Sequence, residues 1–385
     1  MTNSSDGLRI VFIAPAPRAG TVQYTHNLAN ALVQRGHRVM LVTGVGFELA
    51  DYPRSYEALE VFDRYRPRPL RLIRFLWKCM IFRPQIVHLQ GAQHPALYIL
   101  LWAILRMLRI TCFVYTPQDV LPNSLRPYHI RAFRFLYARM RHVFLNAKQN
   151  EPLVVDNFVV PRERITVLPI ADLTSFVREH ITAEPPAIPP GKKVVLCFGL
   201  IEPRKGIHTL LAAAPELFRQ VPDALLLIVG KPLMDIAPLE RQLTQLGLQE
   251  RVRLVPQYVS FAQMAGYFTA ARLLVLPYEN GWNSGVLASA FGFGKPVIAT
   301  RVGGFEEVVA DESTGLLVPS RDPAALAHAL VRLLQDDVLY ASMVKNVQQA
   351  AKDISWDSIA QVTEARYADV LGMGADCAVS QARQH

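Results

Sequence analysis

Residues 193–218 read KVVLCFGLIEPRKGIHTLLAAAPELF, and this stretch decides the fold. Its start, 193–199, is a short apolar run typical of a buried strand, and the part from His208 onward has apolar residues at helical spacing. The turn between them delivers Arg204 and Lys205 to the N-terminus of the helix. Two cations, free backbone N–H groups and the helix dipole meet in such a turn, which suits a diphosphate. A solvated turn that happens to be basic is the alternative, and this motif alone leaves both open.

Strands and helices alternate along most of the chain, which is typical of a parallel sheet covered on both faces. Leu28, Ala31 and Leu32 have the spacing of one helix, and 96–108 forms another. We predict an α/β chain of two tandem doubly wound Rossmann-like domains. Ligands of such sheets bind outside the carboxyl ends of the strands, which predicts an interdomain cleft as the site. The predicted strands are 9–15, 37–43, 86–90, 112–116, 165–170, 193–199, 224–230, 251–256, 273–277 and 296–300.

A proline-dense stretch divides the chain, whose 385 residues exceed what one hydrophobic core usually supports. Residues 173–191 lack periodicity and are expected to form a linker. We assign 1–172 to an N-terminal domain, 192–371 to a C-terminal domain and 372–385 to a flexible tail. The last helices, within 323–371, are candidates for packing back across the joint.

Positive charge is concentrated in the first half of the chain. The net charge is +9, and residues 1–172 hold 22 Lys or Arg against 11 Asp or Glu. Within 64–141 there are 14 basic residues and one acid, Asp119. Such a field attracts anionic lipid headgroups, with about 1 kcal/mol for each basic residue close to a membrane. We favour an anionic membrane surface as the partner of this region over a merely solvated basic face.

One basic segment has the composition of an RNA-binding patch. Residues 131–144 read RAFRFLYARMRHVF. Phe135, Leu136, Met140 and Val143, however, have the spacing of a helix with one buried face. We therefore expect no nucleic-acid partner.

Neither a secretory signal nor a membrane span is expected. The chain begins MTNSSDG and continues directly into an apolar strand, without a basic segment and a cleavage site. The longest apolar run, 96–105, is about half of the ~20 residues that cross a bilayer. These features predict a cytoplasmic protein that is peripheral on the inner face of the membrane. Neither a disulfide framework nor a zinc site is indicated by the scattered cysteines Cys79, Cys112, Cys197 and Cys377.

Two more turns between a strand and a helix in the second half suit a phosphate. Ser284 and Gly285 open an apolar helix, and small residues there let a phosphate approach the backbone N–H groups. Gly303 and Gly304 also precede a helix, whose first turn holds two glutamates that suit the helix dipole. Each turn alone is explained as well by an ordinary helix start. Their recurrence in one domain favours phosphate binding.

The order of the motifs over residues 8–370 resembles that of a bacterial glycosyltransferase family 4 enzyme. PAPRAGTVQYTHNLANALVQRGHRV resembles the family's N-terminal glycine-rich loop and helix, and YTPQDVLPN resembles its acceptor-domain loop. FGLIEPRKGIHTLLAA, SGVLASAFGFGKPVIATRVGGFEEVV and STGLLVPSRDPAALAHAL resemble its nucleotide-domain motifs. The resemblance implies the GT-B fold, with the acceptor on the N-terminal domain and a nucleotide diphosphate sugar on the C-terminal one.

The resemblance also implies transfer of a hexose-type sugar with retention at the anomeric carbon and without a metal or other cofactor. In agreement, the sequence contains no Asp-x-Asp pair or His cluster that would hold a divalent ion. Lys205 matches the family's phosphate-binding lysine. Arg204 is its neighbour and takes over a charge that the family often has where Leu200 stands here. These two cations are the expected catalytic residues, because the departing diphosphate gains negative charge.

The remaining expected site residues bind the two substrates. The nucleotide sugar is assigned Tyr258, Val259, Glu279, Ser284, Gly285, Val286 and Ser289. The acceptor or donor-sugar side is assigned Gly20, Thr21, Gln118 and Asp119.

The chain departs from the family pattern at an acidic pair and at a histidine. The family's two glutamates, eight positions apart, fall on Gly281 and Ser289, so the usual carboxylate contact to the ribose is missing. Ser289 is expected to donate a weaker hydrogen bond, and Glu279 to reach the same space from the loop. A subgroup with Ser-Gly-Val exists within the family, and Ser284 begins the same tripeptide here. Gln118 replaces a histidine and cannot act as a general acid or base.

We therefore expect a glycosyltransferase whose acceptor is a lipid-linked or surface saccharide. Two alternatives stay open. One is a catalytically silent homologue that binds or scaffolds, which the missing glutamates and histidine favour. The other is a nucleotide-sugar epimerase, which requires carboxylates and a histidine at the site.

Overall fold

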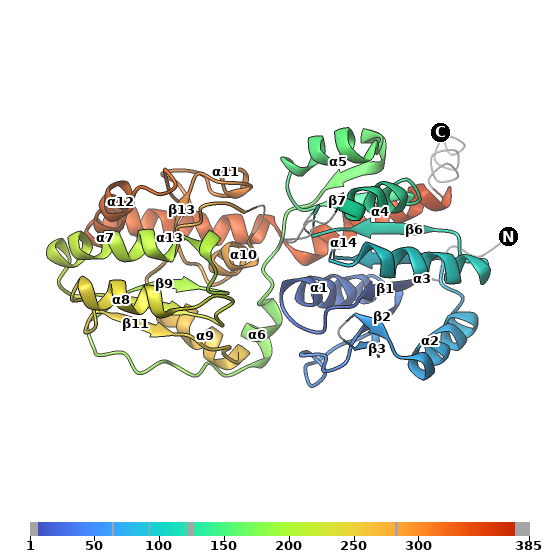
Figure 1. The fold of residues 1–385 in the computed structure, drawn as a ribbon, viewed down its shortest axis with the longest axis horizontal. Helices are drawn as coiled ribbons and strands as arrows, with labels where there is room; N and C mark the ends of the chain where they lie inside the picture. The colour runs from blue at the N-terminus through green and yellow to red at the C-terminus, as the bar shows by residue number, and fades with distance from the viewer. Residues whose placement is uncertain are drawn as a thin grey trace, which may run out of the picture. The chain divides into compact units, whose positions relative to one another are not determined.

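The computed structural model describes residues 7–63, 65–91, 93–118, 120–121, 127–281 and 284–373, which form two compact units (Figure 1). The first unit contains the chain up to Ile170 together with the residues from Ser355 onward. The second unit is Ala171–Ile354. Each unit is an α/β layer structure with its own sheet and its own apolar core.

The first unit is built on a sheet with the order β4-β3-β2-β1-β5-β6-β7-β8. All neighbouring strands are parallel except β3 and β4, which are antiparallel. The strands β1, β2 and β5 are almost entirely buried, as expected of a parallel sheet covered on both faces. The bounds are β1 Arg9–Ala14, β2 Arg38–Gly44, β3 Glu57–Asp63, β4 Arg66–Pro67, β5 Ile86–Gln90, β6 Phe113–Thr116, β7 His142–Leu145 and β8 Ile165–Val167.

Helices of the first unit complete its core. Residues of α2, α3, α4 and α5 share one apolar cluster with the strands, and α1 packs against α14 at the end of the chain. Tyr24 of α1 meets Trp356 of α14 edge to face, with ring centroids 5.1 Å apart. The bounds are α1 Gly20–Gln34, α2 Pro69–Phe82, α3 Pro95–Met107, α4 Pro127–Tyr137, α5 Asn150–Phe158, the 3-10 turn Arg162–Arg164 and α14 Trp356–Leu371.

The second unit has an all-parallel sheet with the order β11-β10-β9-β12-β13-β14. One apolar cluster lies between the sheet and α7, α8 and α12, and another contains residues of α9, α10 and α13. The strands are β9 Lys193–Phe198, β10 Ala224–Val229, β11 Val252–Val255, β12 Leu273–Leu276, β13 Val297–Thr300 and β14 Gly315–Val318. The helices are α6 Ser175–His180, the 3-10 turn Pro203–Lys205, α7 Ile207–Gln220, α8 Ala237–Gln245, α9 Phe261–Ala270, α10 Gly285–Gly292, α11 Phe305–Val308, α12 Pro323–Gln335 and α13 Asp337–Asp353.

The predicted alternation of strands and helices is confirmed, and every predicted strand overlaps an observed one. The helix predicted through 131–144 is wrong in its second half. Helix α4 ends at Tyr137, and Val143 lies in β7, where it pairs with β6 and β8. Short strands that are buried on both faces do not alternate between apolar and polar residues, so this one was mistaken for a helical face.

Two predicted boundaries differ from the observed units. Helix α14, assigned from sequence to the C-terminal domain, packs in the first unit, where its Tyr367 reaches His88. The expected linker 173–191 lies in the second unit and contains α6. It also packs on α9, because a Cβ at Gly266 would lie 1.8 Å from the carbonyl oxygen of Glu184. In the described part of the chain, no helix is both long enough and apolar enough to cross a membrane.

Candidate functional site

The basic turn after β9 lies at the carboxyl end of the second sheet. Lys205 ends a 3-10 turn, and Gly206 then takes a left-handed conformation with φ 62° and caps α7. A Cβ at Gly206 would lie 1.9 Å from the carbonyl oxygen of Pro277, so only glycine lets the turn approach the end of β12 this closely. The first backbone N–H groups of α7 have no capping side chain. This part of the unit therefore suits an anion.

Lys205 is a buried cation. Lys205 is 9% exposed, and its Nζ lies 3.7 Å from the centre of the Tyr278 ring. No carboxylate of the described residues forms an ion pair with this ammonium group. Burying a charge without a counter-charge is costly, and an aromatic face offsets only part of that cost. An anionic ligand beside Lys205 would supply the missing counter-charge.

Arg204 is held by a neighbouring acid. Its Nη2 lies 2.6 Å from Oε1 of Glu202, and its carbonyl oxygen accepts a hydrogen bond from the backbone N–H of Glu279. The guanidinium also lies beside Gly281, where a Cβ would be 3.4 Å from its Nη1. Part of the positive charge of Arg204 is thus already compensated. Lys205 is the less compensated cation of the pair.

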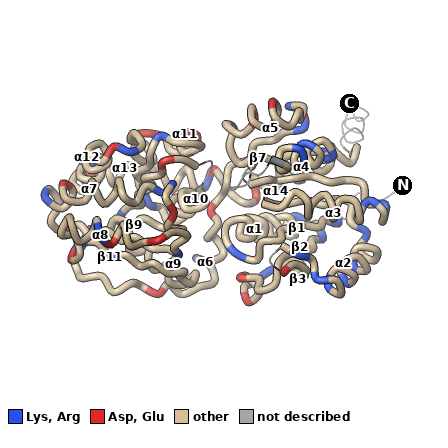
Figure 2. The backbone as a smooth tube through the Cα atoms, in the orientation of Figure 1, with Lys and Arg blue, Asp and Glu red and all other residues tan. Residues whose placement is uncertain are grey.

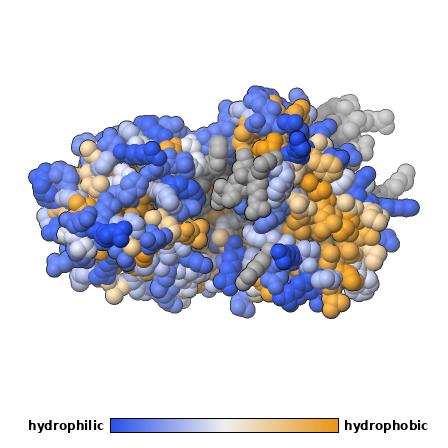
Figure 3. All heavy atoms as spheres, viewed as in Figure 1, coloured by the Kyte–Doolittle hydropathy of each residue, from blue (hydrophilic) through white to orange (hydrophobic). Residues whose placement is uncertain are grey.

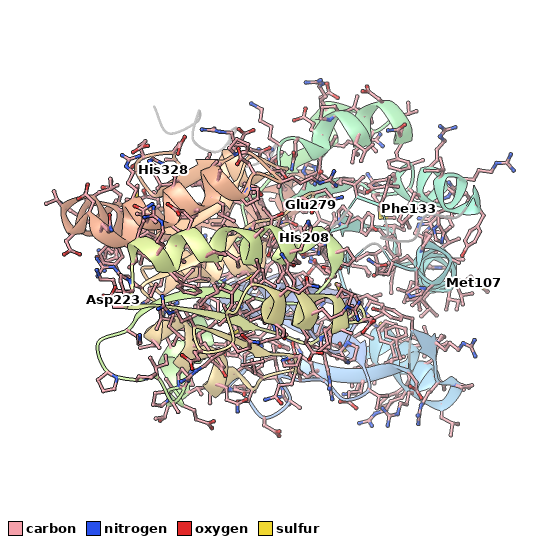
Figure 4. All side chains as sticks on the ribbon, turned by 60° about the vertical axis from the view of Figure 1, so that its left-hand side comes forward. Met107, Phe133, His208, Asp223, Glu279 and His328 are labelled. Carbon is pink, nitrogen blue, oxygen red and sulfur yellow. The ribbon has the colours of Figure 1, made fainter. Side chains whose placement is uncertain are left out.

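The sequence predicted that Glu279 contacts the nucleotide ribose. In the structure, its carboxylate pairs with two side chains of the same unit. Its Oε1 lies 2.9 Å from Nε2 of His208, and its Oε2 accepts a hydrogen bond from Nε of Arg321 at 2.8 Å and lies 2.7 Å from Nη2 of the same guanidinium. Figure 4 shows His208 and Glu279 side by side, at the start of α7 and after β12. The carboxylate itself is largely buried. It ties together three segments at the carboxyl ends of the strands.

The Ser-Gly-Val segment opens α10 close to these residues. The Ser284 hydroxyl lies 3.3 Å from the Tyr278 hydroxyl, and it makes no capping bond to α10. Val286 lies next to Gly199, where a Cβ would be 3.5 Å from its Cγ2. This segment therefore adjoins both the loop after β9 and Tyr278, whose ring faces the Lys205 ammonium. Ser289 is buried in the second turn of α10.

Gly285 has a packing role that the sequence did not indicate. A Cβ there would lie 2.4 Å from Cδ1 of Leu173, so the absence of a side chain lets the segment before α6 lie against α10. The predicted reason for a small residue was the approach of a phosphate. The structure supplies a different reason for this glycine.

The other expected residues of the second unit lie on neighbouring loops. Tyr258 follows β11 and is about half exposed, whereas Val259 belongs to the apolar core. The Gly303–Gly304 turn precedes α11, a helix of four residues. Its Glu306 forms an ion pair with Arg301. Of these residues, Val259 is part of the apolar core, so its role is to support the fold.

In the first unit, Gly20 and Thr21 form the start of α1 at the carboxyl end of β1. Ala19 caps this helix with a positive φ of 73°, and its N–H donates to Oε1 of Glu48. The same oxygen accepts a hydrogen bond from the Gln23 side chain. Glu48 thus stabilises the loop that corresponds to the glycine-rich loop expected from the sequence.

Gln118 adjoins a buried amide at the carboxyl ends of β5 and β6. It has a positive φ of 66°, and its Nε2 lies 3.4 Å from Oε1 of Gln90. Gln90 is fully buried, and its Nε2 has no partner among the described residues. Thr21 comes near the same place, because a Cβ at Gly91 would lie 3.5 Å from its methyl group. Asp119, also expected here, lies outside the described residues.

Sequence reasoning missed four residues of these two clusters. In the second unit they are Tyr278, His208 and Arg321, and in the first unit Gln90. Only Gln90 had a local signal, since it is a polar residue at the end of an apolar strand and precedes a glycine. Within the described ranges, no three or more His, Cys, Asp or Glu side chains are grouped so that they could hold a metal ion.

Comparison with known protein families covers most of both units. Residues 18–171 match the family model described as Glycosyltransferase Family 4. Residues 192–336 match the model described as Glycosyl transferases group 1. Each half of the chain thus matches a glycosyltransferase family model. These matches support the resemblance to glycosyltransferases that was inferred from the order of the motifs.

Curated glycosyltransferases resemble part of the chain. D-inositol 3-phosphate glycosyltransferase of Corynebacterium urealyticum is 34% identical over 180 residues, which is 45% of this chain and 42% of that protein. Phosphatidyl-myo-inositol mannosyltransferase of Mycobacterium leprae is 36% identical over 191 residues, or 49% of this chain and 50% of that protein. The chain thus spans about half the length of the curated relatives it matches.

Solved structures resemble nearly the whole chain. HepE of Anabaena, crystallised with UDP, aligns with a TM-score of 0.73 and 17% identity, covering 94% of this chain and 100% of that one. Sucrose-phosphate synthase of Thermosynechococcus elongatus aligns with a TM-score of 0.71 and 21% identity, covering 94% and 99%. At these identities the likeness concerns the fold. It confirms the predicted tandem Rossmann-like architecture of the GT-B type.

Proposed function

We propose that this glycosyltransferase-family chain transfers a sugar from a nucleotide diphosphate sugar to an acceptor. The second unit binds the donor, and the first unit binds the acceptor. The observation that carries the proposal is Lys205, a buried ammonium group without a carboxylate partner in the described structure, next to the uncapped start of α7. A diphosphate fits both features, because it offers negative charge to the cation and oxygen acceptors to the helix N–H groups.

The proposed mechanism follows from the charge that develops as the bond to the sugar breaks. Electron density moves to the leaving diphosphate, and the Lys205 ammonium and the first N–H groups of α7 stabilise it there. Arg204 contributes the charge that Glu202 leaves uncompensated. Transfer proceeds with retention and without a metal or other cofactor. These two features come from the family resemblance.

A phospholipid-like or lipid-linked acceptor is the class we propose for the first unit. Two of the relatives are named for D-inositol 3-phosphate and for phosphatidyl-myo-inositol. Thr21, Gln90 and Gln118 offer a hydroxyl and two amides at the carboxyl ends of the strands. Amides and hydroxyls of this kind bind the hydroxyl groups of a saccharide or polyol. They also explain how a chain without the family's histidine would still bind its acceptor.

A screen of donor nucleotides tests the proposal. UDP, GDP and ADP and their hexose conjugates are added to the full chain, and the unfolding temperature is measured. A ligand at 100 times its dissociation constant stabilises the protein by about 2.7 kcal/mol. We expect one base to raise the unfolding temperature and the Lys205→Ala variant to lose that shift. If none of the nucleotides shifts unfolding, the donor site is disproved.

Turnover distinguishes the proposed enzyme from a silent homologue. The nucleotide that binds is supplied as its sugar conjugate, together with inositol phosphate or phosphatidylinositol, and the release of nucleoside diphosphate is followed. Acceptor-dependent release supports transfer. Tight donor binding without release with any acceptor favours the binding or scaffolding alternative.

A further inference from the structure

Helix α2 of the first unit has an apolar face that points away from the core. Five large apolar side chains on it are 53 to 82% exposed. At about 100° per residue they fall within one arc of roughly 100° of the helix surface. They are Leu70, Ile73, Trp77, Met80 and Ile81. We call these five residues the outer α2 face.

The outer α2 face is separate from the face that packs the helix onto the sheet. Phe75 and Cys79 are buried in the apolar core of the first unit. The helix is therefore held by one side, and its opposite side is also apolar. Single exposed apolar residues are ordinary, but a contiguous group of this size on one helix indicates an interaction surface.

Positive charge borders the outer α2 face. Arg71, Arg74 and Lys78 follow one another along one edge of it, at helical spacing, and α2 itself contains no acidic residue. Arg71 pairs with the half-buried Glu60 and Lys78 with the exposed Glu57, both of β3, and ion pairs near the surface neutralise little of the surrounding field. Figure 2 shows Lys and Arg gathered along α2.

Helix α3 also exposes apolar residues next to a basic one. Its Met107 is exposed and lies next to the exposed Arg106, and Leu100 is about half exposed. Figure 3 shows hydrophobic residues gathered on the part of the first unit that carries α2 and α3. An apolar surface bordered by cations matches a layer of acyl chains beneath anionic headgroups.

We propose that the outer α2 face inserts into the interface of an anionic lipid bilayer, with α2 lying in the plane of the membrane. Trp77 suits this depth, because its ring is apolar and its indole N–H prefers the headgroup level. A second copy of the chain is a poorer occupant, since a symmetric contact would bring the cationic edges of two α2 helices together. The proposal goes beyond glycosyl transfer and is tested without any sugar donor.

Vesicle binding tests the insertion. The full chain is sedimented with vesicles of phosphatidylcholine alone and with vesicles containing about one third phosphatidylglycerol. We expect binding to the anionic vesicles, and about tenfold or more weaker partitioning for Ile73→Asn. The control is Val338→Asn, which changes an even more exposed apolar residue of the second unit, 83% against 62% for Ile73, and should bind as the unaltered chain does. Equal binding of both variants overturns the proposal.

The fluorescence of Trp77 distinguishes insertion from simple charge attraction. Brominated phosphatidylglycerol should quench the emission of the full chain, and Trp77→Phe should abolish most of that quenching while the melting temperature stays the same. If salt at about 0.5 M releases the protein fully and Trp77 is never quenched, the contact is electrostatic only and insertion is disproved. If the mass in solution is that of a dimer and Ile73→Asn converts it to a monomer without affecting vesicle binding, the face is a contact between copies and the proposal fails.

Discussion

Lys205 combines burial, a positive charge and an aromatic neighbour. Its ammonium group faces the Tyr278 ring, and the described residues offer it no carboxylate. A lysine in a purely structural role at this depth would normally be paired. The arrangement therefore leaves a charge available for a ligand.

We predict that Lys205→Ala lowers the rate of sugar transfer by about 100-fold or more, because one electrostatic contact to the departing diphosphate is lost. Ser289→Ala serves as the comparison, since Ser289 is buried in α10 and offers only a hydroxyl. We expect a change of a few-fold for Ser289→Ala. The measurement is kcat with saturating donor. Similar, small effects of the two substitutions would contradict the role of Lys205.

The sequence was sufficient to single out Lys205 and Arg204 as candidate residues, because both lie within one continuous turn between a strand and a helix. It was insufficient for Arg321 and His208. Their contact with Glu279 joins three segments that lie far apart in the chain. A pattern along the chain carries no information on such contacts until the sheet order is known. The same reason explains why the packing of Gly285 against Leu173 was not foreseen.

At the scale of elements, the docking of α14 depends on a buried histidine. Nδ1 of His88 lies 2.6 Å from the Tyr367 hydroxyl, and its Nε2 lies 2.7 Å from the hydroxyl of Thr116. Burial lowers the pKa of His88 to about 3, with a smaller contribution from His142. Burial also lowers the pKa of His142 to about 4. Both imidazoles are therefore neutral in the folded unit.

We predict that acid weakens the first unit through these two histidines. In the unfolded chain they take up protons near pH 6.5, so their contribution to stability is complete above that pH. This stability is lost as the pH falls below 6.5, down to about 3 for His88 and about 4 for His142, at about 1.4 kcal/mol per pH unit for each histidine. The unfolding temperature measured in steps from pH 7 to pH 5 should fall accordingly.

His88→Gln is the matched variant for this pH dependence. The amide keeps hydrogen-bonding capacity toward Tyr367 but does not titrate. We expect the variant to be less stable at pH 7 and to lose about half of the fall between pH 7 and pH 5. An unchanged slope would assign the acid sensitivity to other groups.

Elements differed in how readily the sequence showed them. Uninterrupted apolar runs such as those of β10 and β12 were found because these strands are buried on both faces. Strand β7 was assigned to a helical pattern because only residues 138–141 separate it from α4. Its identity depends on pairing with β6 and β8, which is a property of the sheet.

At the scale of the whole molecule, the first unit is made from both ends of the chain. Helix α14 packs on α1 and buries Ile359, Thr363 and Tyr367 in this unit. An apolar stripe of this kind would suit either sheet, so periodicity alone did not show which unit α14 joins. The observed choice is fixed by particular partners, among them His88 and Tyr24.

We predict that truncation after Ile354 damages the first unit and spares the second. Loss of α14 removes several buried side chains, each worth about 2 to 5 kcal/mol. Amide hydrogen exchange in α1 and β1 should become at least about tenfold faster, whereas β9 and β10 keep their protection. Truncation after Met373 is the control and should leave both units protected. Unchanged exchange in α1 of the shorter chain would show that α14 is dispensable.

The return of α14 to the first unit also governs the order in which a ribosome can complete the protein. The 184 residues of Ala171–Ile354 are synthesised before α14 emerges, which takes roughly 10 to 40 s at about 5 to 20 residues per second. During that interval the partner surface of α1, including Tyr24, has no α14 to cover it. The half of the protein that is translated first is therefore the half that matures last.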